Sequence, residues 1–419
     1  MNERRVRYRQ SLVALPALYV AAAVLLGVLM PKLDSARDVE AAGAGVGTAR
    51  DILGATAAGM IAFTGFVLAG VLLVVQFAAG QYSPRLVLWF RHDSLTKHAI
   101  GCFLAAFVYA LLALRTLEGE GGDFSPDITV AVALALLVGA CIVFLALLQR
   151  VTDQLRPRIL FGAVAREGIR AARETYPTRL GEQVPDDRSW ESRDPQRVPF
   201  RARPGVVAWF DRPALAAVAA RAGAVIELVP GVGEFVGPRA ELLRVHGRRI
   251  DDPAALAALV HVADERTIEQ DPAFAMRIVV DTAIRALSPA INDPTTAVHG
   301  LDVLEVLVRE LAGHDLDGSL ARDEEGHVRL VWRSPRWDDL LDLAFEEIRE
   351  YGASSVQICR RMRAVLEDLL ASTPAVRHAA INVHLRRLDA TLRGAFPEGS
   401  LERETALVAD RTGLGLGRR

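Results

Sequence analysis

The sequence predicts an α-helical integral membrane protein with four transmembrane helices, followed by a mixed cytoplasmic domain with a small β module and a C-terminal helical bundle. Four long apolar stretches lie in the first 150 residues, and a charged chain of ordinary soluble composition follows. Two of the stretches, Leu12–Met30 and Ala131–Leu148, hold no charged residue over 19 and 18 residues respectively. A bilayer core of about 30 Å needs about 20 apolar residues in a helix, and uncharged runs of this length are rare in soluble proteins.

The overall composition agrees with a chain of two parts. The 51% hydrophobic content averages a lipid-soluble third and a soluble remainder. The net charge is −2 and no basic run is interleaved with aromatic residues, so we expect no nucleic-acid partner. The three cysteines are scattered and form neither a disulfide framework nor a metal motif. We therefore expect no metal and no cofactor.

The predicted membrane helices run over Leu12–Met30, Ile52–Ala79, Ala99–Leu117 and Ile128–Leu148. The second is about 28 residues long, or about 42 Å as a helix, so it should tilt or project beyond the bilayer. The basic start of the chain is also typical of a signal peptide, but the residues after the first stretch lack a good cleavage site. We therefore expect the first helix to be retained.

The second predicted helix differs from the others in its small and polar residues. Small residues at helical spacing let helices approach closely in lipid, and polar groups at membrane depth either bond a neighbouring helix or line a wet path. We expect a packing interface first and a path-lining role second. No ionisable side chain lies between Ile52 and Ala79, which argues against a proton relay. The residues concerned are Gly54, Ala58 and Ala62, at four-residue spacing, and the polar Thr56, Thr64 and Gln76.

The orientation follows from the basic residues near the helix ends. Cytoplasmic loops carry an excess of Lys and Arg, whereas the third loop here is acidic. We therefore expect an inner-membrane protein whose N-terminus and C-terminal domain are both cytoplasmic. The first loop is less decisive because it also holds basic residues. The basic groups are Arg4, Arg5, Arg7 and Arg9, then Arg85, Arg91 and Lys97, then Arg150, Arg156, Arg158 and Arg166; the acidic loop holds Glu118, Glu120, Asp123 and Asp127.

The chain beyond the membrane helices changes character three times. Residues 151–204 read as a helical connector followed by an irregular linker rich in Pro, Arg and Asp. Residues 205–250 hold short β-rich runs separated by Pro and Gly, with a helix over Pro213–Arg221, which predicts a small β module. Residues 251–400 read as a helical domain, and residues 401–419 as a flexible tail.

The helical domain begins each of its first three helices in the same way. An aspartate before a proline occurs at Asp252, Asp271 and Asp293, where the aspartate caps a helix and the proline occupies its first position. These pairs predict helices near 253–268, 272–287 and 294–312. We expect a hairpin around His327–Arg333 and then long helices over 337–371 and 374–393.

One segment closely resembles a known bacterial family. Its hallmark runs from Arg266-Thr-Ile-Glu-Gln-Asp-Pro through Asp281-Thr-Ala-Ile-Arg to Ser288-Pro-Ala-Ile-Asn-Asp-Pro-Thr-Thr-Ala297, and Gln81-Tyr-Ser-Pro-Arg85 is similar too. The family is that of predicted membrane proteins classed as domain of unknown function 2254. The resemblance covers nearly the whole chain and implies a multi-pass inner-membrane protein with a cytoplasmic domain. It implies no mechanism.

The hallmark reads as a helix, a tight polar turn and a second helix. Asp281 and Arg285 lie four residues apart and are able to pair on one helix face. The polar groups of the turn either satisfy the backbone of a sharp corner, form an anion or ligand site at a helix N-terminus, or make a subunit contact. The candidate binding residues are Arg285, Ser288, Asn292, Asp293, Thr295 and Thr296.

Two classes of function remain from the sequence. No catalytic residue is identified, because the nine histidines form no His-Glu-x-x-His pattern and Gly-x-Ser-x-Gly is absent. We expect a homo-oligomer in the lipid bilayer that is a channel or transport-related protein gated by its cytoplasmic domain. The alternative is a membrane-anchored sensor, scaffold or regulator without transport activity. An enzyme is the less favoured third class.

Overall fold

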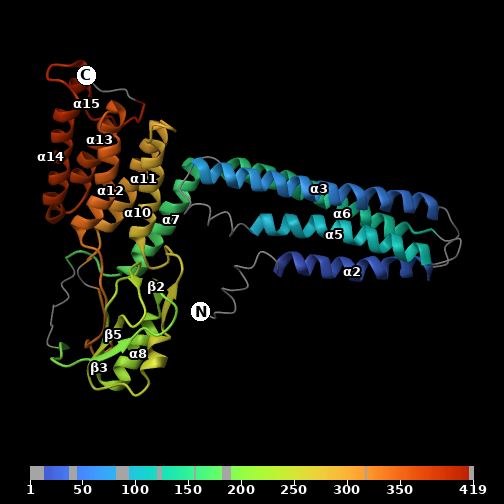
Figure 1. Cartoon of the computed structure of the whole chain (residues 1–419), viewed down its shortest axis with the longest axis horizontal. Helices are drawn as coiled ribbons and strands as arrows, with labels where there is room; N and C mark the ends of the chain where they lie inside the picture. The colour runs from blue at the N-terminus through green and yellow to red at the C-terminus, as the bar shows by residue number, and fades with distance from the viewer. Residues whose placement is uncertain are drawn as a thin grey trace. The chain divides into compact units, whose positions relative to one another are not determined.

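The computed structural model describes residues 14–36, 45–81, 94–119, 125–154, 157–181, 190–316 and 319–414. The chain divides into two compact units, 1–156 and 157–419 (Figure 1). The predicted fold class is confirmed: four helices long and apolar enough to cross a membrane precede a unit of small sheets and C-terminal helices. The expected basic residues at 4–9, and the part of the second loop that holds Arg85 and Arg91, lie outside the described residues.

The N-terminal unit consists of the helices α2 (Ala14–Ser35), α3 (Val46–Gln81), α5 (Ser94–Gly119) and α6 (Asp127–Gln154). All four contain the predicted apolar stretches or most of them, and α3 is the longest at 36 residues. Helix α5 is central, because it packs against α2, α3 and α6 (Figure 1). Its large buried side chains, Phe103 and Tyr109, fill the space between the helices.

Helices α2 and α5 approach each other closely at two glycines. A Cβ atom on Gly27 would lie 2.9 Å from Leu112 Cβ, and one on Gly101 would lie 2.8 Å from the Tyr19 ring. Since Cβ atoms do not come this close to other heavy atoms, only glycine allows this packing. Within one chain, close contact between membrane helices is therefore made by α2 and α5.

A carboxylate at the end of α2 caps the start of α6. Asp34 is 5% exposed and accepts hydrogen bonds from the backbone N–H of Ile128 at 3.2 Å and of Thr129 at 2.8 Å. The Thr129 hydroxyl donates to the same carboxylate at 2.7 Å, and the Tyr109 hydroxyl donates to the Thr129 carbonyl at 2.9 Å. These amides have no partner within α6, so Asp34 acts as its N-cap from a different helix.

The C-terminal unit contains two small sheets. The larger has the order β1-β5-β3-β8-β7 and the smaller β4-β2-β6. All neighbours are antiparallel except β3 and β8, which pair in parallel with Ile226 opposite Leu330. The helix α8 (Arg212–Ala222) follows β2, as predicted, and one core cluster joins both sheets. The strands are β1 (Gln196–Pro199), β2 (Gly205–Phe210), β3 (Ala224–Leu228), β4 (Phe235–Val236), β5 (Glu241–Gly247), β6 (Val260–Ala263), β7 (Leu320–Arg322) and β8 (Val328–Val331).

The prediction of a helix near 253–268 is wrong. Helix α9 covers only Pro253–Ala257, and the chain then enters β6, where Val260 lies opposite Phe210 of β2. The Asp252 cap forms as predicted, with its carboxylate accepting from the N–H groups of Ala254 and Ala255. The alternating apolar residues of 260–263 favour a strand, and pairing with β2 overrides the local helical preference.

Helices α7 and α10 to α15 of the C-terminal unit form one bundle, whereas α8 packs on β3 and β8 (Figure 1). Helix α10 packs on α7, α11 and α12, and α13 packs on α11 and α14. The predicted Asp271 and Asp293 caps are confirmed. The helix expected over 337–371 is broken at Gly352, because Ser355 caps a new helix. The bounds are α7 (Pro157–Thr175), α10 (Pro272–Ala286), α11 (Pro294–Ala312), α12 (Trp337–Tyr351), α13 (Val356–Ser372), α14 (His378–Ala395) and α15 (Leu401–Ala406).

Two further expectations concern the hairpin and the end of the chain. The predicted hairpin is present as β7 and β8, joined through Asp323–His327. Residues 401–414, expected as part of a flexible tail, carry α15 and lie against α13. There Gln357 donates to the Gly413 carbonyl at 3.2 Å, and Arg411 pairs with Asp368 at 2.8 Å.

Candidate functional site

Several small residues of α3 form a stripe that is exposed among the described residues of the N-terminal unit. An added Cβ on Gly54, Gly59, Gly65 or Gly70 would meet no atom within 4 Å. The stripe is exposed, and its small residues recur every three or four positions along the helix. We call this set the α3 stripe: Ala55, Ala58, Gly59, Ala62, Gly65 and Ala69.

The polar residues predicted on this helix divide between two faces. Thr56 and Thr64 lie on the buried face, and Thr64 is only 3% exposed. Their hydroxyls donate to carbonyls of their own helix, Thr56 to Ile52 at 2.7 Å and Thr64 to Met60 at 2.6 Å. Gln76, in contrast, is exposed. The structure therefore separates the threonines from the small residues with which the sequence pattern grouped them.

The hallmark turn is held mainly by its own residues. Asn292 has a positive φ of 49°, which asparagine tolerates better than most residues, and it directs the chain into the Asp293 cap. The Asp293 carboxylate accepts from the Thr296 N–H at 3.1 Å and from the Thr296 hydroxyl at 2.5 Å. The Ser288 hydroxyl donates to the Arg285 carbonyl at 2.7 Å, and Thr295 is exposed. Because Asp293 occupies the N-terminus of α11, its negative charge lies where a bound anion would lie.

The ion pair predicted around Asp281 is made with a different arginine. Arg277, one turn earlier, donates to Asp281 at 2.5 Å and to Glu347 of α12 at 2.9 Å. Arg285 is half-exposed on the same helix. Arg277 thus ties α10 to α12, which sequence spacing alone does not reveal because Glu347 is far away along the chain.

The first part of the hallmark joins the smaller sheet to the bundle. Arg266 donates to the buried Asp271 carboxylate through Nε at 3.1 Å and Nη2 at 2.9 Å. The Gln270 side chain accepts from the Phe210 N–H and donates to the Phe210 carbonyl, each at 3.1 Å, so it pairs with β2 as a strand would. Gly233 leaves room for the guanidinium, since a Cβ there would lie 2.0 Å from Arg266 Nη2. This segment is therefore a junction between β2 and α10.

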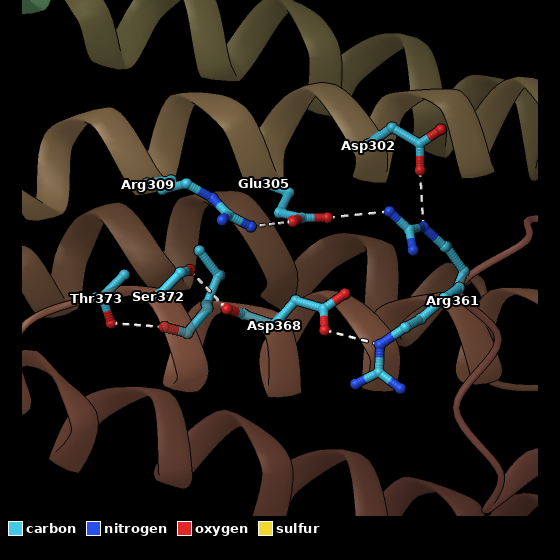
Figure 2. Close-up of polar contacts among 9 residues, drawn as sticks. Asp302, Glu305, Arg309, Arg361, Asp368, Ser372 and Thr373 are labelled. Carbon is cyan, nitrogen blue, oxygen red and sulfur yellow. Dashed lines mark hydrogen bonds and ion pairs between the residues drawn. The ribbon is translucent and has the colours of Figure 1, made fainter.

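Helices α11 and α13 are joined by the ion pairs of the buried Arg361 (Figure 2). Arg361 donates to Asp302 at 2.7 Å and to Glu305 at 3.0 Å, and Arg309 also pairs with Glu305. Further along α13, the Ser372 hydroxyl donates to the Asp368 carbonyl at 2.6 Å (Figure 2). Both carboxylates that contact α13 are paired with Arg361, which indicates a structural network.

A second polar cluster combines two carboxylates and a histidine. His384 Nε2 lies 3.3 Å from Asp342, and Glu346 is on the next turn of α12. This donor set suits a divalent cation, and burial lowers the pKa of His384, which keeps the imidazole neutral. However, Arg387 already pairs with Asp342 at 2.5 Å and with Glu346 at 3.2 Å. The arrangement is therefore an ion-pair network. The sequence indicates only that Asp342 and Glu346, four positions apart, share one face of a helix.

A bidentate ion pair between Arg173 and Glu310 joins helix α7 to α11. Arg173 Nε and Nη2 donate to the two Glu310 oxygens at 2.8 and 3.0 Å. These hydrogen bonds, with a smaller contribution from His314, lower the pKa of Glu310 to about 2. A carboxyl whose pKa is lowered by folding stabilises the protein above its unfolded pKa and loses that effect as the pH falls through the folded pKa.

We therefore expect Glu310→Gln to flatten the acid-side stability profile. Between pH 4.5, the ordinary value, and about 2, the wild-type melting temperature should fall more steeply than that of the variant. Thermal melting of the full chain in detergent at successive pH values measures both slopes. Glu398→Gln, at an exposed position, should keep the wild-type slope. Equal slopes for Glu310→Gln and the wild type would show that this ion pair does not govern acid stability.

A groove opens in the β part of the C-terminal unit. Its volume is about 640 Å³, and it lies between the segment that contains β1 and the segment that contains α9 and β6. Both strands are at an edge of their sheets. We call it the β1–β6 groove; it is lined by Val198, Pro199, Phe200, Arg201, Ala202, Arg203, Pro253, Ala254, Ala257, Ala258, Val260, His261 and Val262. Nothing in the sequence indicates this groove, because its two walls are separated along the chain and the second wall was expected to be a long helix.

Comparisons with known proteins agree with the architecture. The family described as predicted membrane protein, domain of unknown function 2254, matches residues 9–368. Uncharacterised proteins of Mycobacterium bovis and Mycobacterium tuberculosis are each 29% identical over 381 residues, which cover 87% of this chain and 70% of the relative. No solved structure matches the chain. With four apolar helices, the hallmark segment and a match over most of its length, the chain belongs to the family of predicted membrane proteins with domain of unknown function 2254.

Proposed function

We propose that the protein is a homo-oligomer in the membrane, in which copies meet through α3, and that it serves as a membrane-anchored sensor, scaffold or regulator. The exposed α3 stripe carries the proposal. Small residues allow close approach of helices in lipid, and within the chain α2 and α5 use glycines in this way. An added Cβ on Gly54, Gly59, Gly65 or Gly70 would meet no described atom of the N-terminal unit within 4 Å, which leaves room for a second copy on this face.

A channel whose path is lined by α3 is the second candidate. The length of α3 and the polar Gln76 near its end favour it. Against it, Thr56 and Thr64 lie on the buried face and donate to their own helix. The exposed face available for a central axis carries Ala and Gly together with the large apolar side chains of Phe66 and Leu73. Such a face favours tight packing over a hydrated path.

We further propose that the protein lies in the inner membrane with both the N-terminus and the C-terminal unit in the cytoplasm. Four spans place both ends on one side, and the acidic Glu118 and Asp127 flank the opposite loop. For the hallmark turn we propose a structural role, since Asp293, Thr296 and Ser288 satisfy one another and the adjoining backbone.

The α3 contact is tested by adding bulk to its stripe. Gly59→Leu places a side chain in space that is open within one chain, and leucine is also a better helix former than glycine. The monomer should therefore remain stable while association weakens by at least about tenfold, since close helix contact is lost. Mass photometry in nanodiscs, at a series of protein concentrations, measures the oligomer fraction.

The matched control is Gly139→Leu on α6, where an added Cβ likewise meets no atom within 4 Å. It should leave association unchanged. Equal association of the wild type and Gly59→Leu, or a wild type that is monomeric in nanodiscs, would refute the α3 contact. Ion flux measured in liposomes with the same preparations separates the two candidates: an oligomer that conducts supports the channel, and one that does not supports the sensor, scaffold or regulator.

A further inference from the structure

The β1–β6 groove has an apolar floor. Val198, Phe200 and Val260 are buried members of the core cluster that joins both sheets, and they also line the groove. Ala254, Ala257 and Ala258 form one wall, and their small side chains leave the space open. A volume of about 640 Å³ lies within the range of about 300–1,000 Å³ found for small-molecule sites. The groove is therefore able to take the apolar body of a ligand.

The polar part of the groove is entirely basic. Arg201, Arg203 and His261 are exposed, and no acidic side chain is among the lining residues. The His261 ring stacks on Trp209, with ring centroids 5.3 Å apart and planes 22° apart, so its orientation is fixed. The nearby Asp252 carboxylate is engaged by the N–H groups of Ala254 and Ala255. The chain as a whole has a net charge of −2, but this groove is locally positive and attracts an anionic group.

We propose that the β1–β6 groove binds an amphipathic anion: an apolar chain that lies on Val198, Phe200 and Val260, with a carboxylate or phosphate head held by Arg201, Arg203 and His261. Charge complementarity selects against cationic amphiphiles, and the apolar floor selects against small hydrated anions. Because β1 and β6 are edge strands, no further strand among the described residues pairs beside them and covers the groove. The proposal is independent of α3 association, since the groove lies within one copy.

The test uses the full chain in nanodiscs of neutral phosphatidylcholine and a photoreactive probe, tetradecanoic acid with a diazirine on its tail. Mass spectrometry of the cross-linked peptides locates bound probe despite its partition into the lipid. We expect adducts within 198–203 and 253–262. Adducts confined to the membrane helices would overturn the proposal, as would equal labelling of the groove by the corresponding diazirine alcohol, which lacks the charge.

Competition identifies the source of the head group. Unlabelled tetradecanoate that removes groove adducts assigns the site to a free fatty acid. Removal by dioleoyl phosphatidylglycerol added to the nanodiscs, but not by tetradecanoate, assigns it to an anionic phospholipid. Groove labelling that neither competitor reduces would overturn the proposal, because a specific site is saturable.

The basic groups are tested by the double change Arg201→Gln and Arg203→Gln. Groove labelling should fall at least about fivefold, because two charge-assisted hydrogen bonds are lost. Arg197→Gln removes one charge from β1 outside the groove, where Arg197 pairs with Glu241 at 3.5 Å, and labelling should be retained. Ala254→Trp, at an exposed position on the groove wall, should block labelling by filling the space. Unchanged labelling in both groove variants would overturn the assignment.

Discussion

Asp34→Ala should lower the stability of the membrane unit by about 3 kcal/mol, because it leaves two backbone amides and one hydroxyl without their acceptor. The Asp34 carboxylate is 5% exposed, so water has little access to replace it. The loss also removes a negative charge from the N-terminus of α6, where the helix dipole favours it. Thermal melting of the purified full chain in mild detergent, followed by loss of the intact elution peak, measures the effect.

Two other variants define what the carboxylate contributes. Asp34→Asn keeps one acceptor oxygen and should lie between the wild type and Asp34→Ala. Asp51→Ala changes an exposed aspartate near the start of α3 and should leave the melting temperature nearly unchanged. Equal loss in Asp51→Ala and Asp34→Ala would mean that surface charge, and not the cap of α6, explains the result.

Gly233→Ala is expected to destabilise the C-terminal unit by about 3 kcal/mol, through the junction between β2 and α10. Alanine at its φ of 86° costs about 1 kcal/mol. The added methyl group also occupies the position of the Arg266 guanidinium, which must then move away from Asp271. Leaving the buried Asp271 carboxylate without its cation lowers the free energy of unfolding more than the backbone strain does. Urea unfolding, followed by the fluorescence of the five tryptophans, measures it.

Gly326→Ala is the matched control for Gly233→Ala. Its φ of 85° is nearly the same, but an added Cβ meets no atom within 4 Å, so only the backbone cost of about 1 kcal/mol should appear. In an Arg266→Ala background, Gly233→Ala should likewise cost only about 1 kcal/mol, because the guanidinium is already absent. Full additivity of the two changes would show that Gly233 and Arg266 are not coupled.

The features that the sequence predicts well are those coded by neighbouring residues. The four apolar stretches are long enough that lipid leaves few alternatives to a helix, and all four are present. The pairs Asp271-Pro272 and Asp293-Pro294 start α10 and α11 at the expected residues, because a capping side chain and the amides it accepts from are three positions apart.

The features that the sequence does not predict depend on partners far along the chain. Val260–Ala263 becomes a strand because β2 lies beside it, and Arg277 bonds both Asp281 and Glu347 because α12 packs there. On α3, the small residues and the threonines share one period, yet only packing against α5 decides that Thr64 is inside and Gly59 outside. In a helix that is apolar all round, such as α3, the hydrophobic pattern does not mark which face meets a neighbour.

The parallel pairing of β3 with β8 has a consequence for how the chain is made. During synthesis, β3 and β5 leave the ribosome well before Leu330 and Val331, which form the other edge of β3. Until α10 and α11 have been translated and have folded back, that edge offers unpaired N–H and C=O groups to other chains. Closing such a long connection is slow compared with forming a hairpin. We therefore expect the nascent protein to pass through a stage at which the open edge of β3 is exposed to pairing with other chains.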